Sequence, residues 1–388
     1  MYVSSTRSAV DTVLDADRLS ELVGAPVRAA RLRIKPGVSV TASLLEADTD
    51  RAAGWARLLW PINRTKADKT ARRSLRLGLR TRQCETDTGL LLQVGEVAAD
   101  PSLAKHVAAA RAQGLLEGLE GNLLRYNPLR RLVVRTDHGV VRITAGAQRR
   151  SIALQDFAAA IVPVPPLLPD TDVGNTHLSV QRFVGDTDLG RHHDLAATAR
   201  AGAALAALHA ASTELPTDLA EDLDDAEPPA RILALVHARL LSHLDPTLAA
   251  RVQRLGEAMP QRPSGPPVLC HGDASPDQVL LERSSGRIWL TDFDRARLVP
   301  AAVDLGSYLA VADAASGRAL LAGYADAGGQ LPGPDELRAA VARARLARIQ
   351  DPLRHGDPHW RRRLAAEVDH IEALWQRLPG GQRSREAS

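Results

Sequence analysis

Long apolar runs are missing from this chain of 388 residues. No segment approaches the roughly 20 consecutive apolar residues that a membrane-spanning helix needs, and the first residues lack the apolar core of a signal peptide. Cysteine is nearly absent, because only Cys84 and Cys270 occur. Two cysteines are too few for a disulfide framework or a structural zinc site. We therefore expect a cytoplasmic protein that binds no membrane.

Lysine is also scarce, so that arginine supplies nearly all of the positive charge. The only lysines are Lys35, Lys66, Lys69 and Lys105. The formal net charge of +3 is too small to indicate nucleic-acid binding by itself. Residues 64–82 are basic, but they contain no aromatic side chain that would stack on bases. A solvated face is the favoured interpretation of this segment, with nucleic-acid binding as the alternative.

The rest of the composition indicates a globular protein of more than one domain. Hydrophobic residues make up 45% and charged residues 24% of the chain, a balance typical of proteins with a buried core. At roughly 150 residues per domain, the length predicts two or three domains. The N-terminal part is predicted to hold a hairpin over 27–45 with a Lys-Pro-Gly turn, a strand over 90–97 and a helix over 101–118.

A short echo links this part to the next. The pentapeptide Leu-Arg-Ile-Lys-Pro at 32–36 is followed by Leu-Arg-Tyr-Asn-Pro at 124–128. The echo fits an old duplication of a strand-and-turn unit, or two unrelated hairpins with arginine on their solvent faces. Because the similarity covers only five positions, we favour the second, simpler interpretation.

A small antiparallel sheet is predicted after residue 119. Short strands over 123–126, 132–136 and 140–144 are joined by turn-forming residues, and a helix over 151–161 and a strand over 179–184 follow. The chain then turns mainly helical, because alanine, leucine and arginine recur at helical spacing. The predicted helices span 192–211, 229–244, 247–258, 302–325, 335–349 and 360–377.

The segment with the clearest chemistry lies between these helices. Two apolar strands flank the turn 284–286, which predicts a hairpin. Pairing the strands about Ser285 sets Gln278 opposite Asp292, and Asp273 lies on the loop just before. Carboxylate and amide oxygens suit Mg²⁺, and a free carboxylate suits an attacking hydroxyl. The cluster therefore predicts phosphoryl transfer.

The same residues follow the order found in kinases, in which a catalytic aspartate precedes a metal-binding amide by five positions and an Asp-Phe-Gly motif by more. Over residues 119–388 the sequence resembles the aminoglycoside phosphotransferase and choline kinase superfamily. The resemblance rests on His271-Gly272-Asp273, Gln278-Val279-Leu280, Asp292-Phe293-Asp294-Arg295-Ala296 and Val303-Asp304-Leu305-Gly306. It implies an ATP- and Mg²⁺-dependent kinase that acts on a hydroxyl of a small molecule.

The resemblance also implies roles for single residues. Asp273 is expected to be the catalytic aspartate, and Gln278 and Asp292 to bind magnesium. Asp304 would brace the catalytic loop, and His271 would have a structural role in it. For His209, packing against its neighbours is a better interpretation than catalysis.

The nucleotide site departs from the superfamily pattern. The usual lysine is replaced by Arg142, which we expect to grip the phosphates with Asp156 as its acidic partner. The glycine-rich loop is replaced by 127–130, so that Arg130 would contact phosphates. The resemblance places adenine against 181–184, with contacts from Gln181, Phe183 and Val184.

The resemblance implies an α+β fold with two kinase lobes: an N-lobe with a small antiparallel sheet over 119–182 and a mainly helical C-lobe over 183–388. Residues 1–118 would form an additional α/β cap. A pseudokinase that binds nucleotide without transfer is the alternative. The acceptor is expected to be an aminoglycoside-like antibiotic or a sugar, and the acidic segment 218–227 is either a site for a cationic acceptor or a solvated loop. The oligomeric state stays open.

Overall fold

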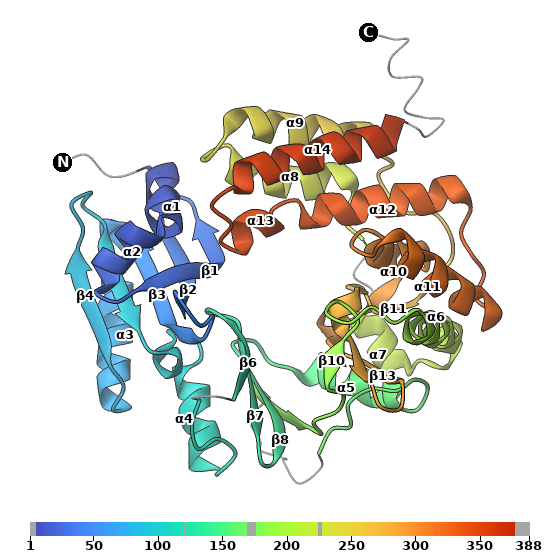
Figure 1. Cartoon of the computed structure of the whole chain (residues 1–388), viewed down its shortest axis with the longest axis horizontal. Coiled ribbons are helices and arrows are strands. Elements are labelled where there is room, and N and C mark those ends of the chain that lie inside the picture. The colour runs from blue at the N-terminus through green and yellow to red at the C-terminus, as the bar shows by residue number, and fades with distance from the viewer. Residues whose placement is uncertain (1–4, 120–121, 169–175, 224–226, 377–388) are drawn as a thin grey trace.

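The computed structural model describes residues 5–119, 122–168, 176–223 and 227–376. Figure 1 shows the elements arranged in a ring, with the N-terminal sheet on one side, a second sheet below, and helices closing the other sides. In the described residues, no helix has the length and apolar character that crossing a bilayer demands.

The N-terminal unit is a five-stranded antiparallel sheet with helices. Its strand order is β1-β2-β3-β5-β4. The hairpin predicted over 27–45 is confirmed, and Gly37 completes its turn with a φ of +66°. The elements are α1 (Thr6–Leu14), α2 (Ala16–Val23), β1 (Val27–Lys35), β2 (Ser39–Glu46), β3 (Ala52–Leu59), α3 (Arg64–Arg76), β4 (Thr81–Glu85) and β5 (Leu91–Gly95).

The second sheet is the N-lobe. The predicted meander is confirmed, in the strand order β6-β7-β8-β9. One face buries apolar residues such as Leu132 and Val141 against α4 (Ala104–Ala112), as alternation along a strand requires. The opposite face carries Arg131 and Arg142. The elements are β6 (Leu123–Asn127), β7 (Arg131–Thr136), β8 (Gly139–Thr144), α5 (Arg149–Ala159) and β9 (Leu178–Gln181).

Both sheets share one chain path. Three successive strands are followed by a helix, and a later strand then pairs with the third, β9 in the N-lobe and β5 in the N-terminal sheet, where the additional edge strand β4 comes first. The two echo pentapeptides lie at equivalent places, near the end of the first strand of each sheet. This placement favours duplication over two unrelated hairpins.

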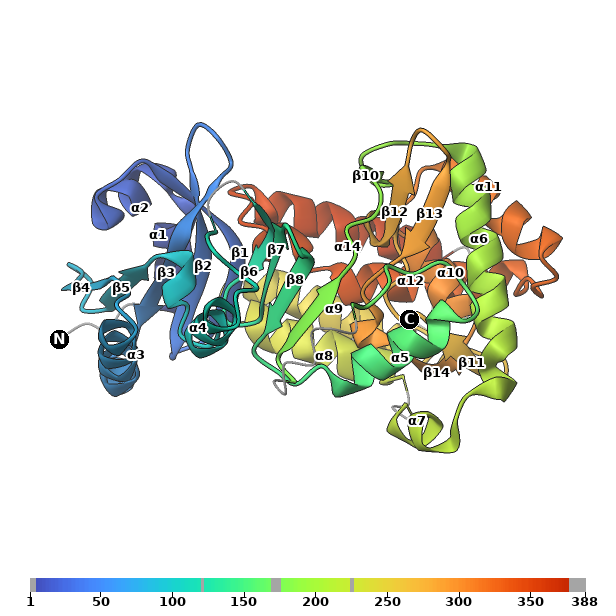
Figure 2. The same cartoon turned by 90° about the horizontal axis from the view of Figure 1, so that it is seen from below.

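The C-terminal half is mainly helical, as predicted, with two small pieces of sheet (Figure 2). The helix predicted over 302–325 is in fact two helices, because Asp313 caps a new helix by accepting hydrogen bonds from the N–H groups of Ala315 and Ser316. The helices are α6 (Leu195–Ala210), α7 (Thr217–Asp222), α8 (Ala230–Leu241), α9 (Pro246–Ala258), α10 (Ala302–Leu309), α11 (Ala314–Asp326), α12 (Pro334–Arg348), α13 (Asp351–Arg354) and α14 (Trp360–Gln376). The strands are β10 (Thr187–Asp188), β11 (Pro267–Cys270), β12 (Val279–Glu282), β13 (Arg287–Leu290) and β14 (Arg297–Pro300).

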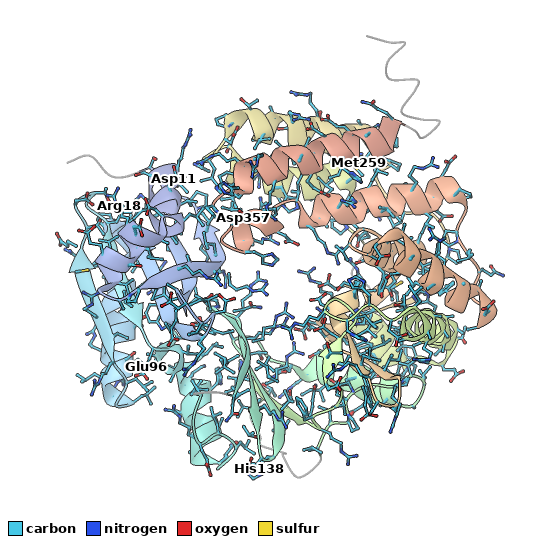
Figure 3. All side chains as sticks on the ribbon, in the orientation of Figure 1. Asp11, Arg18, Glu96, His138, Met259 and Asp357 are labelled. Atoms are coloured by element: carbon cyan, nitrogen blue, oxygen red, sulfur yellow. The ribbon has the colours of Figure 1, made fainter. Side chains whose placement is uncertain are left out.

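The N-terminal unit is docked firmly on the C-terminal helices. One apolar core contains residues of β2, such as Val40, together with Leu346 of α12 and Trp360 of α14. At the surface Arg361 donates a hydrogen bond to Asp11 at 2.9 Å, and Figure 3 labels Asp11 beside this junction. The N-terminal unit is therefore a fixed wall of the molecule.

Candidate active site

The hairpin of β12 and β13 carries the predicted metal ligands, but its register differs from the prediction. Val279 pairs with Leu290 and Glu282 with Arg287, so that Gln278 lies opposite Thr291 and not Asp292. The reason is the turn, which has four residues, 283–286, and ends on Gly286 with a φ of +71°. Asp292 is the first residue beyond the paired strands.

The carboxylate of Asp304 holds the backbone of the loop that carries Asp273. This carboxylate is fully buried and accepts hydrogen bonds from the backbone N–H groups of His271 at 2.6 Å and Gly272 at 2.8 Å. His209 Nε2 lies 3.1 Å from the same carboxylate, and its Nδ1 lies 2.9 Å from the Tyr324 hydroxyl. Burial alone would raise the pKa of Asp304, but the hydrogen bonds from His209 and the loop hold it below its ordinary value. His209 is thus packed in the core, as the sequence favoured.

Glycine is required at position 272 because the loop passes close to the backbone of Arg295. Gly272 has a φ of +78°, and a Cβ there would lie 1.9 Å from the carbonyl oxygen of Arg295. His271 is buried, and its Nε2 lies 2.7 Å from the carbonyl oxygen of Thr291. The loop is therefore tied both to Asp304 and to the strand that leads into Asp292.

The backbone conformation of Asp292 and two arginines fix the orientation of its side chain. Its φ of +70° places it in the left-handed region, which is unusual for a residue with a side chain. Arg131 donates a hydrogen bond to Oδ2 at 2.7 Å and Arg142 donates to Oδ1 at 3.3 Å. Burial alone would raise the pKa of Asp292, but the two guanidinium groups hold it well below its usual range. Asp292 is therefore ionised near neutral pH.

Asp273 is also held by two arginines. Arg348, at the end of α12, donates a hydrogen bond to Oδ1 at 2.9 Å, and Arg295 lies 3.4 Å from Oδ2. Arg348 also donates to the Ser307 hydroxyl at 2.9 Å. The orientation of this carboxylate is thus fixed from the C-terminal helices.

These groups meet at a cavity of about 1030 Å³. Asp273, Gln278, Asp292 and Arg130 line it, as does β1 of the N-terminal unit. Gln278 is buried, and its Oε1 lies 3.5 Å from the Thr291 hydroxyl. The loop that carries Asp273 and the ends of the β12–β13 hairpin therefore share one cavity.

The expected pair of Arg142 with Asp156 does not form. Arg142 pairs with Asp292 and Asp294 instead. On α5 the neighbouring Gln155 faces inward, where its amide donates to the carbonyl oxygen of Pro165 at 2.6 Å. Because successive helix residues are turned by about 100°, Asp156 is directed to solvent. The acid that holds Arg142 thus comes from the region after β13.

The residues expected at adenine lie outside the described lining of this cavity. Gln181 donates a hydrogen bond to Gln155 at 2.8 Å. The Arg135 guanidinium lies 4.0 Å from the centre of the Phe183 ring, and Val184 is half-buried. The structure therefore ties Gln181 to α5 and covers one face of Phe183.

The described acidic residues of the segment 218–227 lie in a helix or are paired. The first part of the segment lies in α7, and residues 224–226 lie outside the described residues. Glu227 is paired internally, 2.5 Å from Arg297 and 3.1 Å from Arg343. These pairs leave Glu227 no free charge for a cationic acceptor.

Among the arginines that hold the two aspartates, Arg142 was predicted as a site residue, but Arg131 and Arg348 were not. Arg131 lies on the same face of the sheet as Arg142, since the strands pair Arg131 with Thr144 and Val133 with Arg142, and the bias toward arginine was a usable signal. No signal in the sequence pointed to Arg348, because it lies 75 residues from Asp273 along the chain.

Comparison with known proteins agrees with this geometry. Residues 112–340, more than half of the chain, match the sequence profile of the phosphotransferase enzyme family. The chain belongs to the phosphotransferase enzyme family. The predicted resemblance is confirmed, as is the α+β fold with a small antiparallel N-lobe sheet and a mainly helical C-lobe. Most of the N-terminal unit lies outside the match.

Several solved structures are similar to parts of this chain. A choline/ethanolamine kinase family protein from Mesorhizobium loti is 20% identical, over 70% of this chain and 96% of that chain, with a TM-score of 0.47. A type I macrolide 2'-phosphotransferase is 21% identical, over 69% of this chain and 96% of that one, with a TM-score of 0.46. The GDP complex of wild-type aminoglycoside 2'-phosphotransferase-IIIa is 16% identical over 70% and 98%, with a TM-score of 0.48. No curated protein matches the chain.

Proposed function

We propose that this member of the family is an ATP- and Mg²⁺-dependent kinase that phosphorylates a hydroxyl of a small molecule. The observation that carries the proposal is the meeting of Asp273, Gln278 and Asp292 at one cavity. A fixed carboxylate for the acceptor and oxygen ligands for a metal are the groups that phosphoryl transfer needs. ATP is abundant in the cytoplasm, and both cysteines are free thiols, which suits that compartment.

Asp273 would orient the acceptor hydroxyl and take its proton. The hydroxyl oxygen forms a bond to the γ-phosphorus of ATP, the bond from that phosphorus to the bridging oxygen breaks, and ADP leaves. Arg348 and Arg295 restrict the carboxylate to one orientation. Such restriction of a reacting group lowers the entropic part of the barrier.

Magnesium would be held by Asp292 and Gln278, and the donor set fits it. Mg²⁺ prefers oxygen ligands and retains several waters, so one carboxylate and one amide oxygen suffice. Arginine hydrogen bonds occupy one lone pair of each Asp292 oxygen, and each oxygen has a second. When bound, the metal neutralises charge on the β- and γ-phosphates.

The triphosphate would be bound by arginines in place of lysine and a glycine-rich loop. Arg142 and Arg131 reach Asp292 from the N-lobe sheet, and Arg130 stands on the turn above the cavity. Guanidinium groups fork two phosphate oxygens each. We place adenine near Gln181, Phe183 and Val184, where Phe183 keeps 39% of its surface exposed.

A nucleotide-binding protein without transfer activity is the second candidate. It is favoured by one observation: both oxygens of Asp273 and both oxygens of Asp292 are already engaged by arginines. In that case nucleotide would bind, but no acceptor would be phosphorylated.

Acceptor-dependent ADP release separates the two candidates. The wild-type protein and Asp273→Asn are assayed with ATP and magnesium against a panel of aminoglycosides, macrolides, sugars and sugar phosphates, with mass measurement of the product. Transfer predicts a product heavier by one phosphoryl group with the wild type only. Nucleotide binding without any such product would support the second candidate and refute the first.

A further inference from the structure

The cavity has a strong excess of positive charge. Ten arginine or lysine side chains line it against five aspartates, an excess of five positive charges. The basic residues are Arg31, Arg33, Lys35, Arg125, Arg130, Arg131, Arg150, Arg295, Arg348 and Arg354. No aromatic side chain other than that of His355 is among the described lining residues, so the cavity offers no aromatic cage for an ammonium group.

The N-terminal unit supplies one wall of this cavity. Arg31, Arg33 and Lys35 come from β1, where a register irregularity sets Arg31 in the left-handed region with a φ of +52°. The strand is fixed in place, because a Cβ at Gly356 would lie 2.4 Å from the carbonyl oxygen of Ala29. This wall lies outside the region that matches the family.

Several of these arginines have no acidic partner. In the described parts of the chain, Arg31, Arg125 and Arg130 form no ion pair within 4 Å. Burial lowers the pKa of Arg125, and the nearby positive charges of Arg131 and Arg31 lower it further. Burial and the neighbouring Arg33 and Arg354 act in the same direction on the pKa of Arg130. Asp277 and Asp292 act against this on Arg125, and Asp277 and Asp351 on Arg31, but burial and the neighbouring arginines outweigh them. Like charges are thus gathered in a half-buried place with only part of their charge compensated, which an anion would relieve.

Nucleotide alone does not balance this charge. A magnesium–ATP complex carries roughly two net negative charges, against an excess of five positive charges in the lining. Arg131 pairs with Asp292 and suits the nucleotide phosphates, and Arg130 is next to it on the turn. Arg33 and Arg354 lie beside Arg130, and Arg33 donates a hydrogen bond to the carbonyl oxygen of Leu129 at 3.5 Å. Arg31 and Arg33 of β1 and Arg354 of α13 come from outside the region that matches the family, and they remain for another ligand.

We propose that the acceptor of this kinase carries a phosphate group of its own, which is bound by Arg31, Arg33 and Arg354 while its free hydroxyl faces Asp273. The proposal rests on the proposed kinase function and narrows the acceptor to a phosphorylated alcohol. A phosphate adds about two negative charges at neutral pH and offers oxygens that several guanidinium groups can fork. The phosphoryl transfer is the one proposed above, so that the proton of the acceptor hydroxyl passes to Asp273. The product then carries two phosphates.

Matched pairs of acceptors test the proposal by turnover. ADP release is measured with glycerol and glycerol phosphate, glucose and glucose phosphate, and an aminoglycoside. We expect kcat/KM to be roughly ten- to a hundredfold higher for the phosphorylated member of the preferred pair, as charged hydrogen bonds contribute. Preference for the neutral sugar or for the aminoglycoside would overturn the proposal.

Variants of β1 test whether Arg31 and Arg33 cause the preference for a phosphorylated acceptor. Arg33→Gln, and Arg31→Asn, which tolerates a positive φ, should each raise KM for the phosphorylated acceptor about tenfold and change KM for ATP by less than about threefold. Arg28→Gln is the control, because Arg28 lies on the same strand, outside the cavity lining, and pairs with Asp50. A rise in KM for ATP alone would assign the arginines to the nucleotide and refute the proposal.

A binding measurement decides the case even if no acceptor is turned over. Asp273→Asn is titrated with each sugar and its phosphate by calorimetry, with a non-hydrolysable ATP analogue and magnesium present and then without them. Binding of the sugar phosphate only, weakened by Arg33→Gln, supports the anion site whether or not the kinase function holds. Equal binding of both sugars, or of neither, contradicts it.

Discussion

Arg348 donates a hydrogen bond to Asp273 Oδ1 at 2.9 Å and a second one to the Ser307 hydroxyl at 2.9 Å. The loop that carries Asp273 is thereby oriented by a helix residue that follows Asp273 by 75 positions. An arginine has the fork of donors that two separate acceptors need, whereas a lysine is a single point of charge.

Arg348→Gln should lower kcat roughly ten- to a hundredfold while KM for ATP stays within about threefold, because the carboxylate loses its orientation and not its chemistry. Arg348→Lys should recover part of the loss, since its amine reaches one acceptor. The control Arg338→Gln lies on the same helix in an exposed pair with Asp335. Equal kcat in Arg348→Gln and the wild type, measured as acceptor-dependent ADP release, would show that Arg348 does not position Asp273.

Asp304→Asn should reduce the free energy of unfolding by roughly 3–5 kcal/mol, because two backbone N–H groups and His209 lose a buried ionised partner. Urea unfolding measures the loss. The pKa of Asp304 lies below its ordinary value of 3.8 in the folded protein, so its contribution is present above that pH and is lost as the pH falls further. Asp335→Asn, on the exposed side of α12, is the control and should be near neutral.

Gly356→Ala should loosen the contact between β1 and α13. The residue has a φ of +80°, and the added Cβ would lie 2.4 Å from the carbonyl oxygen of Ala29. We expect a loss of roughly 2–4 kcal/mol, from the conformational cost and the forced shift together. Gly78→Ala is matched, with a φ of +69° and nothing within 4 Å, and should show only the conformational cost of about 1–2 kcal/mol. Equal melting temperatures of the two variants would contradict the close contact.

His237 should make the protein sensitive to mild acid. Burial, and then the nearby charge of Arg354, lower its pKa from 6.5 to about 4. The unfolded chain therefore takes up the proton first, and stability falls as the pH drops from 6.5 toward 4, by up to roughly 3 kcal/mol. His237→Leu should flatten the curve of unfolding free energy against pH in this window, whereas His243→Leu, at an exposed position, should leave it unchanged. An unaltered slope in His237→Leu would exclude His237 as the source.

The sequence predicted much of the fold because local patterns decide it. Apolar alternation placed the strands of the N-lobe, and the spacing of Asp273, Gln278 and Asp292 identified the family. The hairpin register was wrong by one residue because turn length sets it, and a four-residue turn has the same glycine end as a three-residue one. No local pattern could show which charges meet across the molecule.

Asp156 and Arg348 illustrate that limit. The sequence offered Asp156 as the only acid on the helix after Arg142, but helical phase turns it outward. Arg348 lies at the end of a helix with no motif around it, and only packing of α12 against α10 brings it to Asp273. The anionic character of the cavity's ligand likewise emerges only when β1, the N-lobe and α13 are assembled.

The catalytic role of Asp273 is tested most directly by comparing nucleotide binding with turnover in Asp273→Asn. We expect the variant to bind magnesium–ATP with the affinity of the wild type, while acceptor-dependent turnover falls by roughly a hundredfold or more, because proton acceptance and positioning are lost together. Turnover equal to that of the wild type would contradict the assignment of Asp273 as the catalytic residue.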